Sequence, residues 1–283
     1  MHDRILVLGA TGLVGGQVFQ ALSRHGYDVR GASRRKSGGQ WAHFDLLDPA
    51  THAPALDGVD AVMLVSRPGD EEAHVHAAPF LEAMAAAGVR RVVDISALGA
   101  QLRPDFSIRR VERLVEDSGL EWTHVRPNFF AQMLARPPLS TEIARSRTLR
   151  LPLDAARVAY VDAHDVAAVA FRALTDRGLA GRAISLNGPE ALDHGEIARR
   201  ISKALGETVR YIAISEAQAR ELLVARGFPA PQVERVLRFY ALCRQGVCAA
   251  PDTEAAQLLG RPLGTLEAVI TANLPVWQAG AHA

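Results

Sequence analysis

The chain has 283 residues, enough for one large domain or two modest ones, and its 32 basic and 31 acidic side chains nearly cancel. This balance gives no reason to expect nucleic acid or an anionic membrane as a partner. The two cysteines, Cys243 and Cys248, are too few for a disulfide framework and have no neighbouring histidines, so no metal site is expected. No apolar run reaches the length of a membrane span and no signal-peptide pattern opens the chain, which predicts a soluble cytoplasmic protein.

A short apolar run near the start, residues 5–8, leads into three glycines spaced three apart: Gly9, Gly12 and Gly15. This pattern is typical of a buried parallel strand, a glycine turn and a helix, predicted over residues 13–25, whose free N–H groups face an anion. Gly9 would permit the turn, Gly12 the approach of a pyrophosphate, and Gly15 close packing of the helix on the strand. The segment predicted to bind a dinucleotide consists of Gly9, Ala10, Thr11, Gly12, Leu13, Val14 and Gly15.

A second strand, predicted over residues 27–33, ends in cations where the adenosine ribose lies in this architecture. A carboxylate there would favour a free 2′-hydroxyl, whereas Ser33 is followed by Arg34, Arg35 and Lys36, which favour a 2′-phosphate. Arg34 is the best candidate because a planar guanidinium can bind phosphate through two N–H groups and stack on adenine. The sequence therefore predicts NADPH (NADP) as the cofactor in preference to NADH, and the alternative is a solvated charge run on a loop.

Strands and helices then alternate. Strands are predicted at residues 41–44, 60–65, 91–95 and 121–125, and helices at 71–87 and 108–117. Such alternation predicts an α/β fold with a Rossmann-type doubly wound parallel sheet, which binds ligands at the carboxyl ends of its strands. Residues after these strands are further candidates for cofactor contact, although ordinary loop chemistry explains each of them equally well: Asp45, Leu46, Ser66, Arg67, Pro68, Ser96, Arg126, Pro127, Asn128 and Phe129. Asp45 would accept a hydrogen bond from the adenine amino group. The residues that follow the last three strands would surround the nicotinamide.

Several segments together resemble the NmrA-like group of atypical short-chain dehydrogenases/reductases. They are the glycine segment, Arg34, residues 112–130 (ERLVEDSGLEWTHVRPNFF), 161–167 (VDAHDVA), 186–190 (LNGPE) and 259–263 (LGRPL). The resemblance implies a Rossmann core over residues 1–130 that binds an NADP-type cofactor. It also implies a smaller carboxyl-terminal α/β part, residues 131–283, which binds the substrate and packs on the core as one compact unit.

The chain departs from the broader superfamily in its proton donor. Most short-chain reductases use a Tyr-x-x-x-Lys pair, in which the lysine lowers the pKa of the tyrosine. None of the four tyrosines, Tyr27, Tyr160, Tyr211 and Tyr240, has a lysine four residues later, so carbonyl reduction by that route is not expected. No catalytic residue is assigned.

Two function classes remain. One is an NADPH-dependent reductase of a conjugated, aromatic acceptor, because similar family members reduce quinones, azo dyes, triphenylmethane dyes and cyclic iminium ions. The other is a non-catalytic NADP(H)-sensing regulatory protein of the NmrA type. The second half of the chain looks complete enough to bind a substrate, which favours the reductase.

The second half carries an arginine-rich stretch, residues 136–157, which is either a solvated loop with ion pairs or a mouth that attracts an anionic substrate. Further on, helices are predicted over residues 163–176 and 193–205, the latter capped by Asp193, and a strand over 183–186. Ser215 and Gln218 fit a capping box. Residues 232–242 carry an apolar stripe typical of a core face, in which Phe239 and Tyr240 are alternatively pocket residues. The partner is expected to be a small molecule, with the protein a monomer or homodimer.

Overall fold

The computed structural model describes residues 3–66 and 70–278, so the predicted cofactor residues Arg67 and Pro68 lie outside the described part. The chain divides into two compact units. The first extends to Pro127 and resumes over Ala163–Leu186, and the second consists of Asn128–Asp162 and the chain from Asn187 onward. This division differs from the predicted boundary after residue 130, because the segment 163–186 returns to the first unit.

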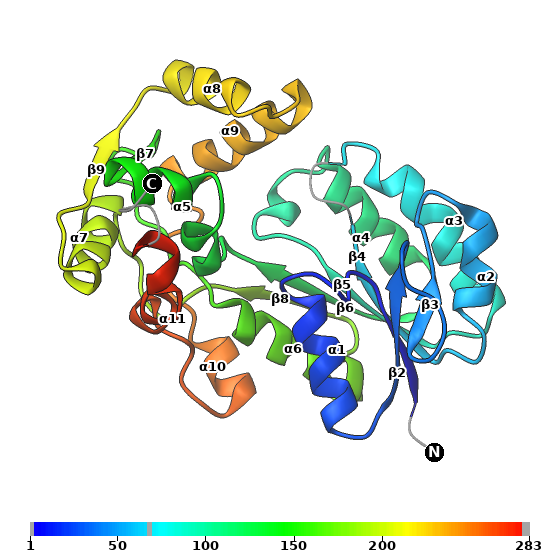
Figure 1. Cartoon of the computed structure of the whole chain (residues 1–283). Helices are drawn as coiled ribbons and strands as arrows, with labels where there is room; N and C mark the ends of the chain where they lie inside the picture. Colours follow the sequence, from blue (N-terminus) through cyan, green and yellow to red (C-terminus); the bar gives the residue numbers. More distant parts are fainter. Residues whose placement is uncertain (1–2, 67–69, 279–283) are drawn as a thin grey trace. The chain divides into compact units, whose positions relative to one another are not determined.

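The described part of the first unit is a seven-stranded parallel sheet in the order β3-β2-β1-β4-β5-β6-β8 (Figure 1). Its strands are β1 Arg4–Val7, β2 Asp28–Ser33, β3 Trp41–His43, β4 Ala61–Val65, β5 Arg91–Ile95, β6 Glu121–Pro127 and β8 Arg182–Leu186. The order reverses between β1 and β4, and in a doubly wound sheet ligands bind beside such a reversal, at the carboxyl ends of the strands. The predicted doubly wound α/β fold is therefore confirmed.

Helices cover both faces of this sheet (Figure 1). They are α1 Gly15–Arg24, α2 His52–Ala55, α3 Ala73–Ala86, α4 Ser107–Asp117 and α6 Ala163–Thr175. Helix α1 packs against α6, and α3 packs against α4. Because both faces are covered, the central strands carry buried apolar side chains on both sides: Ile5, Leu6 and Val7 of β1 are fully buried. Burial of each such side chain stabilises the fold by about 1.5–3 kcal/mol.

One strand runs further than predicted. The sequence pattern ends it at residue 125, but β6 continues through Arg126 and Pro127 because both remain paired with β8, at Ser185 and Leu186. Arg126 and Pro127 therefore lie within the sheet rather than in a loop after it. The same pairing explains why residues 163–186 belong to the first unit, since β8 completes the edge of its sheet.

The second unit contains one parallel pair of strands, β7 Thr148–Leu151 and β9 Arg210–Ala213, among helices. The helices are α5 Leu139–Ser146, α7 His194–Leu205, α8 Glu216–Ala225, α9 Ala230–Arg244, α10 Glu254–Leu259 and α11 Leu266–Gln278. Short 3-10 turns in the two units are Pro49–Thr51, Ala100–Leu102, Ala131–Ala135 and Arg177–Leu179. Over the described ranges, no helix is long and apolar enough to cross a membrane.

Local sequence signals set several helix starts in this unit. Asp193 caps α7 by accepting a 2.9 Å hydrogen bond from the Glu196 N–H, and Ser215 and Gln218 form the predicted capping box of α8. The predicted stripe on α9 is a core face, because Val233 and Leu237 are buried against α8. At the end of α11, Trp277 is fully buried and donates from Nε1 to the Leu134 carbonyl at 3.1 Å.

Candidate functional site

The glycine turn after β1 has the backbone geometry that the sequence predicts. Gly9 has φ +65°, a left-handed conformation that favours glycine, and its carbonyl accepts a 2.7 Å hydrogen bond from the Gly12 N–H. A Cβ atom on Gly15 would lie 2.3 Å from the Gly9 carbonyl oxygen, so only glycine fits there. Gly15 therefore allows the start of the helix to lie close to the glycine turn.

The first turn of α1 is open to an anion. The helix begins at Gly15, Val14 provides no side-chain cap, and the first turn carries no acidic side chain. The N–H groups at this end consequently face no side-chain acceptor, as a phosphate-binding helix start requires. Of the residues between the glycines, Ala10 and Val14 are buried, Leu13 is half-buried and Thr11 is exposed. This backbone cradle fits a dinucleotide pyrophosphate.

The cations after β2 form a small exposed group. Ser33 Oγ accepts from the backbone N–H groups of Arg35 and Lys36 at 3.2 and 3.1 Å, which shapes the turn. Lys36 Nζ lies 4.1 Å from the centre of the Trp41 ring. Within the described residues, the guanidinium groups of Arg34 and Arg35 have no hydrogen-bond or ion-pair partner, and both side chains are exposed. They are thus available to an external phosphate.

After β3, the two predicted cofactor residues are partly used by the protein itself. Asp45 Oδ1 accepts from the Leu47 N–H at 3.1 Å, and the Asp45 N–H donates to Thr51 Oγ1 at 3.0 Å. Leu46 is a buried member of the core. An adenine contact by Asp45 stays a prediction that would use its other carboxylate oxygen.

Two serines follow the adjacent strands β4 and β5. Val65 and Ile95 are the last paired residues of these strands, so Ser66 and Ser96 are the next position on each. Ser66 Oγ is buried and has no hydrogen-bond partner among the described residues, which is unusual for a polar group inside a protein. Ser96, also buried, donates from Oγ to Glu112 Oε1 at 2.6 Å. The two hydroxyl groups therefore differ in what they can still bind.

Glu112 of α4 is a fully buried carboxylate held by two arginines. It accepts from Arg126 Nε and Nη2 at 2.7 and 2.8 Å, and from Arg109 Nη1 at 2.8 Å. Burial alone would raise the pKa of Glu112, but the hydrogen bonds from Arg126 and Ser96 outweigh it and hold this pKa below its usual range. The carboxylate therefore stays ionised near neutral pH.

A second buried pair lies beside this group. His124 Nδ1 is 3.1 Å from Asp94 Oδ2, and His124 Nε2 is 3.4 Å from Glu116 Oε1. Desolvation raises the pKa of Asp94, and the hydrogen bond from His124 opposes this rise only in part. Asp94, Glu112 and His124 lie close enough for their ligand atoms to surround a cation, but both oxygens of Glu112 already accept from guanidinium groups. The Glu112 carboxylate of this cluster is thus already compensated by arginine.

The last two predicted cofactor residues belong to the second unit. Asn128 donates from Nδ2 to the Ala159 and Cys248 carbonyls at 3.0 Å each and to Asn187 Oδ1 at 2.8 Å. Its Oδ1 accepts from the Phe129 N–H at 2.8 Å, so the whole amide group holds the local backbone. Cofactor contact by Asn128 stays a prediction, beside a structural role that the sequence did not indicate.

Comparison with known proteins places this chain in a family. The model described as "NmrA-like family" matches residues 1–247. The chain belongs to the NmrA-like family. Among its relatives, an NAD(P)H azoreductase from Xenophilus azovorans is 34% identical, over 92% of this chain and 94% of that protein. A (4-alkanoyl-5-oxo-2,5-dihydrofuran-3-yl)methyl phosphate reductase from Streptomyces griseus is 37% identical, over 91% of this chain and 93% of that protein.

A solved structure confirms the fold of this NmrA-like chain. The NADPH-dependent quinone oxidoreductase from Escherichia coli, solved with NADPH, superposes with a TM-score of 0.84 at 23% identity, covering 95% of this chain and 99% of that chain. At this identity the likeness shows the fold alone. The family and the Rossmann-type fold predicted from the sequence are both confirmed.

In this NmrA-like protein, the second unit contains aromatic side chains whose mutual contacts were not predicted from the sequence. Phe129 contacts Tyr160 and Phe239, with ring centres 6.2 and 6.0 Å apart. The Tyr160 hydroxyl and His194 Nε2 are 3.0 Å apart. Burial raises the pKa of Tyr160 well above its usual value and lowers the pKa of His194 to about 4. The sequence pattern did not indicate the contact between Tyr160 and His194, because the two residues are 34 positions apart.

The arginine-rich stretch of this NmrA-like chain, Arg136, Arg145, Arg147, Arg150 and Arg157, is largely paired inside the second unit. Arg147 binds Glu207 at 2.8 Å, and Arg150 binds Glu142 at 2.9 Å. Glu142 also accepts from Arg226. Arg157 donates to the Ala191 carbonyl at 2.7 Å. The stretch contains α5 and β7 rather than a plain loop, and the contacts of Arg147, Arg150 and Arg157 agree with the ion-paired interpretation; a mouth for an anionic substrate stays a prediction.

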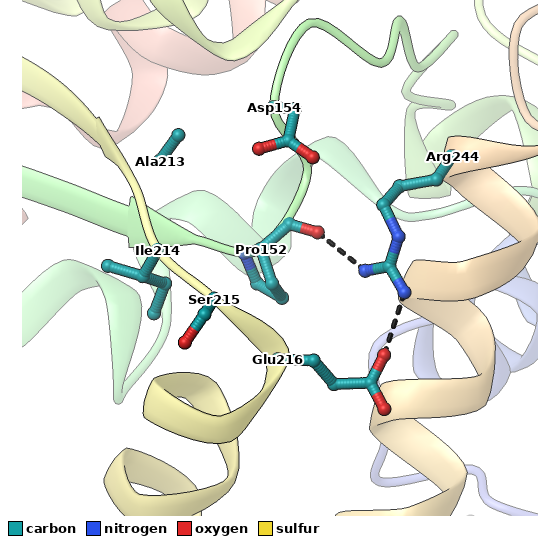
Figure 2. Close-up of a pocket in the computed structure, with 7 residues that line it drawn as sticks. All are labelled: Pro152, Asp154, Ala213, Ile214, Ser215, Glu216 and Arg244. Atoms are coloured by element: carbon teal, nitrogen blue, oxygen red, sulfur yellow. Dashed lines mark hydrogen bonds and ion pairs between the residues drawn. The ribbon is translucent and has the colours of Figure 1, made fainter.

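An open hollow of about 380 Å³ lies on the second unit (Figure 2). Its lining residues are Pro152, Asp154, Ala213, Ile214, Ser215, Glu216 and Arg244. Arg244 donates to the Pro152 carbonyl and to Glu216 Oε2, both at 2.7 Å, so its charge is already compensated (Figure 2). None of the residues predicted to bind the cofactor lines this hollow.

Proposed function

We propose that this protein is an NADPH-dependent reductase that transfers a hydride to a conjugated aromatic acceptor of the quinone, azo, imine or dye type. The observation that carries the proposal is the open glycine turn and α1 start, with an uncommitted Arg34 at the end of the neighbouring strand β2. Two NmrA-like relatives above 30% identity are named as reductases, one of them dependent on NAD(P)H. The chain is accordingly an NAD(P)H-dependent oxidoreductase.

The first unit provides groups of the right kind for each part of the cofactor. Backbone N–H groups of the segment from Gly9 to Gly15, other than that of Gly12, would hold the pyrophosphate, and Arg34 with Arg35 would hold the 2′-phosphate. Asp45 would accept a hydrogen bond from the adenine amino group, while Ser66 and Ser96 would contact the nicotinamide. The cofactor, when bound, supplies the hydride, and the residues of the chain bind and orient it.

The choice of acceptor follows from the missing proton donor. The Tyr-x-x-x-Lys pair is absent, and the hydroxyl hydrogen of Ser96 is committed to Glu112. An acceptor that is already electrophilic, with water as its proton source, needs only orientation from the protein. We assign acceptor recognition to the second unit, where Phe129, Tyr160 and Phe239 provide aromatic surface. The alternative, a regulator that senses NADP(H), is favoured by the same lack of an assigned proton donor.

The experiment that separates these functions measures binding and turnover in parallel. The purified protein is titrated with NADPH and NADP⁺, and loss of NADPH absorbance is followed with quinones, azo dyes, triphenylmethane dyes and cyclic imines. Binding with turnover on any acceptor supports the reductase and identifies its substrate class. Tight binding with no turnover across the panel supports the sensor, and absence of binding refutes both.

A further inference from the structure

The hydroxyl group of Ser96 has a fixed hydrogen-bond polarity. Its one hydrogen is donated to Glu112 Oε1 at 2.6 Å. Glu112 cannot supply a hydrogen in return, because Arg126 and Arg109 keep its carboxylate ionised through three further hydrogen bonds. Toward any ligand, Ser96 can therefore act only as an acceptor.

The hydroxyl group of Ser66 can still donate its hydrogen. This serine occupies the position next to Ser96 on the adjacent strand, where neighbouring backbones run about 4.8 Å apart. Its Oγ is buried and has no partner among the described residues, so its hydrogen is available. A buried hydroxyl without a partner destabilises the fold, and a ligand that accepts a hydrogen bond from it removes this cost. Side by side, the two serines offer one acceptor and one donor.

A carboxamide matches this pair, since its N–H group donates and its carbonyl oxygen accepts. We propose that Ser96 accepts a hydrogen bond from the carboxamide N–H of the nicotinamide and that Ser66 donates to the carboxamide oxygen. The proposal rests on the proposed function, because it assigns residues to the nicotinamide of the same cofactor. The buried group of Glu112, Arg126 and Arg109 then acts as a positioning device that sets which end of the carboxamide faces β5.

The test uses two dinucleotides that differ only at this group, NADP⁺ and its 3-acetylpyridine analogue, in which a methyl group replaces the amide nitrogen. Their dissociation constants are measured by calorimetry for the wild type, Ser96→Ala and Ser66→Ala. We expect the wild type to bind NADP⁺ about tenfold more tightly than the analogue, the value of one hydrogen bond. In Ser96→Ala the affinity for NADP⁺ should fall about tenfold and the affinity for the analogue should change little. The variant should therefore no longer prefer NADP⁺ over the analogue.

The second variant has a different signature. Both dinucleotides carry the carbonyl oxygen, so Ser66→Ala should weaken both by the same factor and preserve their ratio. Ser118→Ala is the matched control, because its Oγ donates to the Val115 carbonyl at the end of α4 and should change neither constant. Thermal unfolding of each variant checks that it is folded.

The outcomes separate the inference from the proposed function. A wild type that binds neither dinucleotide refutes the function, and the inference falls with it. A wild type that binds NADP⁺ and the analogue equally refutes the inference alone. So does a Ser96→Ala variant that loses affinity for both probes to the same extent, or for neither.

Discussion

Replacement of Glu112 by alanine should destabilise the first unit strongly. The carboxylate has no exposed surface and accepts four hydrogen bonds, at 2.6–2.8 Å, from Ser96, Arg109 and Arg126. Its removal deprives the Arg126 guanidinium, whose side chain is only 10% exposed, of the carboxylate that it is hydrogen-bonded to. An uncompensated buried charge is the costliest result of a single substitution in such a pair.

The magnitude follows from which contacts survive. Four independent hydrogen bonds to a charged group would sum to about 6–12 kcal/mol. Arg109 keeps Glu116 as a partner at 2.6 Å, however, so its charge is not stranded. The loss is therefore that of one broken buried ion pair, about 3–5 kcal/mol in the free energy of unfolding.

Urea unfolding followed by circular dichroism measures this loss. Asp105→Ala is a matched control in the same unit, because Asp105 also accepts two hydrogen bonds from one arginine, Arg103, but with 63% of its side chain exposed. That variant should unfold nearly as the wild type does. Glu112→Gln keeps the volume, so a loss that it shares is due to charge rather than to a cavity. A Glu112→Ala variant as stable as Asp105→Ala would refute the reasoning.

Three further predictions test other parts of the molecule. Arg34→Ala removes a charge-assisted phosphate contact worth roughly 1.5–3 kcal/mol, so NADPH affinity should fall about 10- to 100-fold while NADH affinity barely changes in a fluorescence titration; equal losses would contradict the assignment. Gly15→Ala places Cβ 2.3 Å from the Gly9 carbonyl oxygen, so the turn must shift. The free energy of unfolding, measured by thermal unfolding, should fall by about 1–3 kcal/mol, and NADPH should bind more weakly. A variant with unchanged stability and affinity would show that the turn can shift without cost. Burial lowers the pKa of His194 from 6.5 to about 4, so below pH 6.5 the unfolded chain takes up a proton that the folded chain does not. His194 should therefore reduce stability by about 2 kcal/mol between pH 7 and pH 5, and His194→Gln should flatten the urea profile over this range; parallel profiles would exclude this origin.

Local backbone demands are what the sequence alone determined. Three such demands each produce a pattern within a few neighbouring residues. They are the left-handed backbone of Gly9, the helix start that leaves no room for a Cβ at Gly15, and the apolar strands covered on both faces. From these the fold class and the glycine cradle followed, whereas the family was predicted from the resemblance of several segments along the chain. The caps of Asp193 and Ser215 were predictable for the same reason, since each bonds a residue three positions away.

One of the buried charges has a signal in the sequence. Ile108, Val111 and Val115 stand at helical spacing on the inward face of α4, and Glu112 lies within this stripe. A charged residue at such a position needs partners, but the spacing does not identify them. Arg126 became a partner only because β6 runs two residues beyond its predicted end, held by β8.

Tertiary structure decided the contacts between groups that are far apart in the chain. Ser96 meets Glu112 across 16 residues, and Asn128 meets the Cys248 carbonyl across 120. No local pattern encodes such pairs, because the strand register and helix packing that create them are set by the burial of whole elements. The sequence therefore predicted which residues follow the strands, except at β6. Folding determined whether a side chain there lacks a partner among the described residues, as Ser66 does, or is committed, as Ser96 and Asn128 are.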